Sequence, residues 1–157
     1  MASIRYEIDL AVDAARAWSA LRQVGLAHRL FAGVLVEGRL DGDVRTVTFD
    51  DGLVTRERII DVSEERRRVV YSVIEGTPMT HHNASMQIFD CGEGLSRFVW
   101  IADFLPDDFG PTMLPLMKRG AEALKENLET GAFDGTDVRQ LGHEHKKARS
   151  AICRAGP

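Results

Sequence analysis

The sequence has little cysteine, no long hydrophobic run and no excess of positive charge, and each absence excludes a class of protein. Its two cysteines, Cys91 and Cys153, form no CxxC pair and lack the spacing of a zinc site. No segment approaches the ~18 consecutive apolar residues of a membrane-spanning helix. Lys and Arg total 20 against 24 Asp and Glu, a net charge of -4. We therefore expect neither nucleic acid as a partner nor a membrane span.

Signals for export and for common cofactors are also missing. Residues 1–7 include the charged Arg5 and Glu7 and contain no apolar block, so we predict a cytoplasmic protein. The sequence has no GxSxG elbow, no GxGxxG or phosphate-binding loop, and no HExxH motif. The expectation is a protein with no cofactor and no metal site.

The pattern that is present predicts one domain that begins with a strand and two short helices. A chain of 157 residues, 44% of them hydrophobic, can build one real core. Residues 4–12 alternate apolar and polar side chains, which is typical of a half-buried strand. Asp13 stands where a helix N-cap belongs, before a short helix over 14–22 and a second helical turn over 26–31.

The rest of the domain reads as an antiparallel meander followed by one long helix. Six strand-like runs lie between Val34 and Phe104, separated by turns of which Asp41-Gly42 and Asp51-Gly52 are typical hairpin connections. Apolar residues then recur at three- and four-residue steps from Phe109 to Gly131. We predict a domain over 1–131 and a polar, flexible tail over 132–157.

This order of elements resembles the helix-grip fold of the SRPBCC superfamily, which includes START domains and birch-pollen-allergen-like proteins. Local motifs also look like bacterial proteins described as polyketide cyclase/dehydrase and lipid transport-like. The resemblance covers about residues 3–130. The matching segments are Thr55 with Glu57-Arg58-Ile59, Tyr71-Ser72-Val73-Ile74, His81-His82-Asn83-Ala84-Ser85, Trp100 to Pro106, and the run from Met117 to Leu128.

The resemblance implies an α+β fold in which a curved, antiparallel seven-stranded sheet wraps around the long C-terminal helix. Such a sheet and a single helix leave an apolar cavity between them. The implied function is binding of a small hydrophobic or polyketide/lipid-like ligand, with cyclase, aromatase or dehydratase activity as one hypothesis. The alternatives are a carrier without catalysis, or a protein-interaction module with a closed cavity, whose long-helix face joins a protein partner or a second copy as a homodimer.

Two consecutive histidines are candidates for a catalytic base. His81 and His82 lie in a predicted strand, so their side chains must point to opposite faces. The apolar neighbours Ala84 and Met86 favour His82 as the inward residue, whereas the resemblance favours His81 together with Asn83 and Ser85. Both histidines stay candidates, and the alternative for each is an exposed or merely hydrogen-bonded imidazole.

Glu57 and Tyr71 are the other candidates for polar contact with a ligand. The resemblance carries Glu57 over as an inward acid that serves as general acid or ligand anchor, and the alternative is an ion pair with an arginine at the rim. The Tyr71 hydroxyl could donate to a ligand oxygen or to a neighbouring residue. The full predicted ligand-binding set is Thr55, Glu57, Val69, Tyr71, Val73, Asn83, Ser85, Met86, Trp100, Phe104, Phe109, Met113 and Met117.

Overall fold

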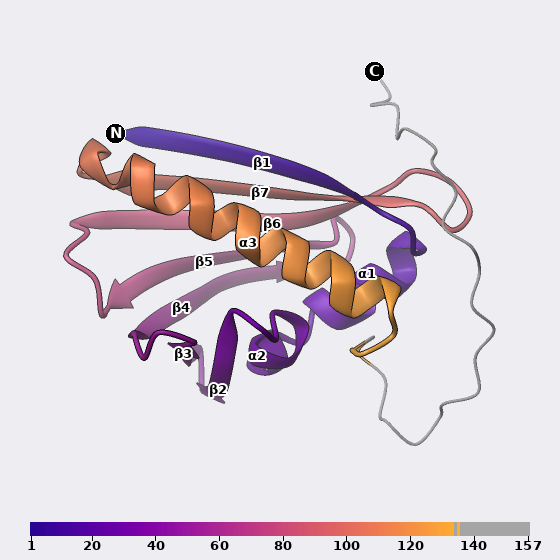
Figure 1. Ribbon diagram of the computed structural model, residues 1–157, viewed down its shortest axis with the longest axis horizontal. Coiled ribbons are helices and arrows are strands. Elements are labelled where there is room, and N and C mark those ends of the chain that lie inside the picture. Colours follow the sequence, from indigo (N-terminus) through magenta and orange to yellow (C-terminus); the bar gives the residue numbers. More distant parts are fainter. Residues whose placement is uncertain (134, 136–157) are drawn as a thin grey trace.

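A computed structural model describes residues 1–133 and 135, which form a seven-stranded antiparallel sheet with one long helix across its concave face (Figure 1). The strand order is β1-β7-β6-β5-β4-β3-β2. The strands are β1 (Ala2–Leu10), β2 (Leu35–Asp41), β3 (Val44–Phe49), β4 (Val54–Ser63), β5 (Arg68–Glu75), β6 (His81–Asp90) and β7 (Ser96–Leu105). The helices are α1 (Ala14–Leu21), α2 (Ala27–Leu30) and α3 (Gly110–Glu129), with 3-10 turns η1 (Val24–Leu26) and η2 (Asp107–Phe109). The predicted fold class is confirmed.

The curvature of the sheet has a local cause in the pairing of β4 with β5. The pairing of β4 with β5 shifts register twice, between Arg56 and Glu57 and again between Ile59 and Asp61. Each β-bulge inserts an unpaired residue, which bends the strand and increases its twist. This bend brings β2 and β3 round toward α2, while β1 and β7 run alongside α3 (Figure 1).

Helix α3 closes the concave face with a stripe of buried residues. Met117, Ala121, Leu124 and Leu128 are at most 1% exposed and recur at three- and four-residue steps, so they share one side of the helix. Gly120 lies on the same side, and a Cβ there would stand 2.8 Å from the Trp100 ring. The missing side chain is therefore what lets the indole of β7 lie against the helix.

The predicted N-cap residue of α1 makes a different contact from the one expected. Asp13 has the extended backbone of an N-cap, yet its side chain makes no capping hydrogen bond. Its Oδ1 accepts instead from the Gly94 backbone N–H, in the turn between β6 and β7. The carboxylate thus ties the start of α1 to a turn 81 residues further along the chain.

The core extends slightly past the predicted domain end at residue 131. Phe133 is only 5% exposed, and the Arg29 guanidinium lies 5.2 Å from the centre of its ring. The remainder of the predicted tail, 134 and 136–157, lies outside the described residues. Within the part of the chain that the structure describes, no helix is long and apolar enough to cross a membrane.

Candidate functional site: a cavity between the sheet and helix α3

A partly open cavity of about 110 Å³ lies between the concave face of the sheet and α3. Its wall is mostly apolar and comes from α2, strands β2 to β7 and α3. The more exposed lining residues gather at three places, namely Leu53 between β3 and β4, Thr77 and Met79 between β5 and β6, and Met113 and Leu116 on α3. We take these three segments as the mouth of the cavity.

Eight residues of the predicted ligand-binding set line this cavity, and five do not. The lining residues of this set are Thr55, Glu57, Tyr71, Val73, Met86, Trp100, Met113 and Met117. Of the remaining predicted residues, Val69 and Phe104 are buried in the core, and Phe109 is half-buried against it. His81 is exposed, and Asn83 and Ser85 share its face of β6, which is the face away from the cavity.

His82 joins these eight from the separate set of catalytic candidates. The alternation of β6 thus places His82 and Met86 toward the cavity and His81 away from it.

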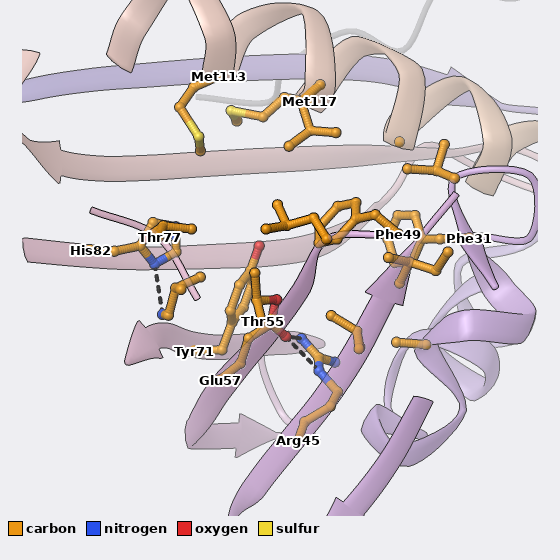
Figure 2. A pocket seen from close by; sticks show the side chains of 18 of the residues that line it. Phe31, Arg45, Phe49, Thr55, Glu57, Tyr71, Thr77, His82, Met113 and Met117 are labelled. Carbon is orange, nitrogen blue, oxygen red and sulfur yellow. Dashed lines mark hydrogen bonds and ion pairs between the residues drawn. The ribbon is translucent and has the colours of Figure 1, made fainter. Parts of the chain in front are cut away.

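A buried ion pair forms one side of the cavity. Arg45 of β3 and Glu57 of β4 are cross-strand partners, and the Arg45 Nη2 and Nε lie 2.5 and 2.7 Å from Glu57 Oε2 (Figure 2). Both residues are 7% exposed. Arg45 Nη1 also donates to the Val24 carbonyl at 3.2 Å, and the guanidinium carbon lies 5.2 Å from the centre of the Tyr71 ring. Glu57 therefore pairs with a buried arginine in the wall.

Tyr71 extends from β5 toward the methionines of α3 (Figure 2). The Trp100 indole N–H donates to its hydroxyl oxygen at 3.2 Å. Burial, and secondarily the negative charge of Glu57, raise the pKa of Tyr71 above the usual value for a phenol. The hydroxyl therefore stays protonated at neutral pH and can donate a hydrogen bond.

His82 faces the cavity with one ring nitrogen already committed to the backbone. The Val73 backbone N–H donates to His82 Nδ1 at 3.0 Å, so that nitrogen carries no proton (Figure 2). Burial, and then the proximity of His81, lower the pKa of His82 to about 4. The imidazole is consequently neutral at pH 7 with its proton on Nε2. In this tautomer Nε2 has no free lone pair, so His82 presents a hydrogen-bond donor and not a base.

Thr55 adds a hydroxyl with no partner. Its side chain is 2% exposed and lines the cavity, and Thr55 Oγ1 makes no hydrogen bond to any described residue. A buried polar group without a partner is costly unless water or a ligand satisfies it. The wall therefore combines apolar surface with buried polar groups that can meet a ligand, on Thr55, Tyr71 and His82, and with the hydroxyl of Thr77 at the mouth.

Several lining residues are absent from the set predicted from the sequence. Arg45, Val47 and Phe49 alternate along one face of β3, and Phe31 lies after α2. The alternation itself could have placed the β3 residues inward. Across the hairpin around Asp51-Gly52, Arg45 also pairs with Glu57, so the register of that turn predicts their contact.

The order of the elements and the cavity define the class of protein as a START-like fold, and comparison with solved structures supports this class. A START superfamily protein from Mycobacterium smegmatis matches with a TM-score of 0.70 at 10% identity, covering 82% of this chain and 97% of that one. XoxI from Bacillus cereus matches with a TM-score of 0.73 at 19% identity, covering 82% and 96%. Norcoclaurine synthase from Thalictrum flavum, in complex with dopamine and hydroxybenzaldehyde, matches with a TM-score of 0.64 at 20% identity, covering 80% and 84%.

The particular family follows from the sequence. Residues 1–131 match the family described as polyketide cyclase / dehydrase and lipid transport, and the chain belongs to that family. None of the curated proteins matches the chain in sequence. The resemblance noted from the sequence motifs is thereby confirmed for the family and the fold.

Proposed function

We propose that this protein binds a small, largely apolar molecule in the cavity between the sheet and α3. The observation that carries the proposal is the composition of the wall, which is apolar except for a few convergent polar groups, including the unpartnered and buried Thr55 hydroxyl. Sites for small molecules commonly combine an apolar lining with a small number of placed polar groups. The family description and the START-like fold agree with a ligand-binding protein.

The volume of the cavity favours a ligand on the scale of one aromatic ring. An engineered apolar cavity of about 150 Å³ accommodates benzene, and the cavity here has about 110 Å³ and a partly open mouth. The structurally similar norcoclaurine synthase has been solved with dopamine and hydroxybenzaldehyde, which are single-ring molecules. Larger polyketide or lipid ligands would require Met113 and other side chains at the mouth to move.

Within this proposal His82, Tyr71 and Thr55 orient the ligand through hydrogen bonds, and the hypothesis of His82 as catalytic base is replaced by a donor function. Glu57 helps to shape the wall through its ion pair with Arg45. The same arrangement serves a carrier and an enzyme, since donors that orient a bound molecule can also polarise it. Conversion of a bound compound, measured after binding is established, separates these two cases.

Native mass spectrometry of freshly purified protein, followed by organic extraction, is the first test. We expect the protein to carry an apolar compound. If it carries none, calorimetry should detect binding of added single-ring compounds. Two neighbouring substitutions on β5 provide a matched pair, because Val73 lines the cavity while Ile74 is 41% exposed on the opposite face. Val73→Trp should weaken binding at least about tenfold by filling the cavity, and Ile74→Trp should leave it unchanged.

The proposal is wrong if the purified protein carries nothing and binds none of the added compounds. It is equally wrong if Val73→Trp, shown by circular dichroism to be folded, binds as well as Ile74→Trp. In either case the concave face of the sheet is not the binding site.

A further inference from the structure

The Tyr71 hydroxyl has a proton for which the described residues offer no acceptor. The Trp100 indole N–H can only donate, and it donates to the Tyr71 oxygen at 3.2 Å. That contact occupies a lone pair of the oxygen and leaves the hydroxyl proton free to point elsewhere. Because the ring extends from β5 toward α3 across the cavity (Figure 2), a ligand in the cavity is the available acceptor.

His82 offers a second donor in the same part of the cavity. The Val73 N–H fixes the proton of the neutral imidazole on Nε2, and Nε2 makes no hydrogen bond to a described residue. The rings of Tyr71 and His82 lie 5.7 Å apart between their centres, at 44° to each other. Two neutral donors from adjacent strands therefore serve one region of the wall.

The wall has no spare positive charge for an anionic ligand. The Arg45 guanidinium lies 2.5 Å from the Glu57 carboxylate, so its charge is compensated inside the wall. Protonation of His82 would put a second proton on Nδ1, which faces the Val73 N–H. An ionised carboxylate without a compensating charge is costly to bury, so the site disfavours acids.

We propose that the cavity selects an uncharged ligand whose polar group accepts hydrogen bonds, such as a ketone or an aldehyde, with its carbonyl oxygen at Tyr71 and His82. This inference rests on the proposed function, because it concerns the ligand of the same cavity. Tyr71 and His82 determine specificity by donating hydrogen bonds to the ligand, and the cavity prefers a carbonyl over a carboxylate.

Three single-ring probes of matched shape test the inference by isothermal titration calorimetry at pH 7. Acetophenone carries the carbonyl, α-methylstyrene replaces its oxygen with a CH₂ group, and benzoate carries a charge. The Tyr71→Phe variant keeps the ring and removes the donor. Loss of one hydrogen bond should weaken acetophenone binding about three- to tenfold, and leave the affinity for α-methylstyrene unchanged.

Infrared spectroscopy of bound acetophenone gives a second readout that does not depend on affinity. Donation by Tyr71 should lower the carbonyl stretching frequency relative to acetophenone in hexane, and Tyr71→Phe should return part of that shift. Benzoate should bind at least about tenfold more weakly than acetophenone, since the wall leaves its charge uncompensated.

The outcomes separate the inference from the proposed function on which it rests. If Tyr71→Phe weakens both neutral probes equally, or the carbonyl frequency does not change, the donor assignment is wrong while the binding cavity stands. Tighter binding of benzoate than of acetophenone overturns the preference for uncharged ligands. If none of the three probes binds and the purified protein carries no compound, the proposed function fails together with the inference.

Discussion

The most informative single prediction concerns the buried imidazole of His82 and its effect on stability at acid pH. The pKa of His82 is lowered to about 4 in the folded protein, chiefly because the side chain is buried, against 6.5 for an ordinary histidine. Between these two values the unfolded chain binds more protons than the folded one, so the free energy of unfolding falls as the pH decreases. This loss of stability is nearly complete at pH 4 and absent above about pH 7.

The magnitude follows from the two pKa values. Their difference corresponds to about 3 kcal/mol lost between pH 7 and pH 4. Urea denaturation at a series of pH values measures this loss. In His82→Gln the amide oxygen can still accept from the Val73 N–H, but the titrating group is gone. The variant should therefore lose about 3 kcal/mol less than the natural protein over the same interval.

The neighbouring His81 provides the control, because it is exposed and lies on the other face of β6. His81→Gln should retain most of the acid-induced loss, since the charge of His81 is the smaller cause of the lowered pKa. Equal pH profiles for His82→Gln and the natural protein would refute the reasoning. So would a histidine ¹⁵N spectrum that shows the proton of His82 on Nδ1 at pH 7.

Three further substitutions test the wall and the boundary of the domain by urea denaturation at pH 7. Glu57→Gln leaves the Arg45 charge uncompensated and should lower the free energy of unfolding by about 3–5 kcal/mol. The double variant Arg45→Met with Glu57→Gln should regain most of this stability. A double variant as unstable as Glu57→Gln alone would contradict the pairing. Gly120→Ala places a Cβ against the Trp100 ring, and overpacking of about 1–3 kcal/mol should outweigh the helix preference for alanine and alter tryptophan fluorescence. Phe133→Ala should lower the free energy of unfolding by about 3–5 kcal/mol. A change near zero would mean that the domain ends at residue 131.

The sequence predicted the fold well because its information is local and repetitive. Alternation of apolar side chains marks strands, and an Asp-Gly pair marks a hairpin, so most elements can be found one at a time. Asp13 shows the limit of this approach. Its position before α1 predicted an N-cap, but the donor that its carboxylate binds is the Gly94 N–H, which is distant in sequence.

The candidate site was harder to predict because facing and pairing depend on register. Alternation alone established that His81 and His82 face opposite ways, and two arguments then disagreed about which one points inward. A shift of one residue in strand pairing reverses every side chain of a strand. The pairing of Tyr71 with Ala84, and of His82 with Phe104, fixes that register in the folded sheet.

By itself, then, the sequence determined the succession of strands and helices, the family, and the set of polar residue types available to a cavity. Only the tertiary structure decided that Arg45 neutralises Glu57. It also decided that the Trp100 N–H donates to the Tyr71 oxygen, and that the Val73 N–H fixes the tautomer of His82. The physical reason is that the chemistry of a side chain is set by its residue type. The position of its proton, and the donor and acceptor positions that it has left for a ligand, are set by neighbours on other strands.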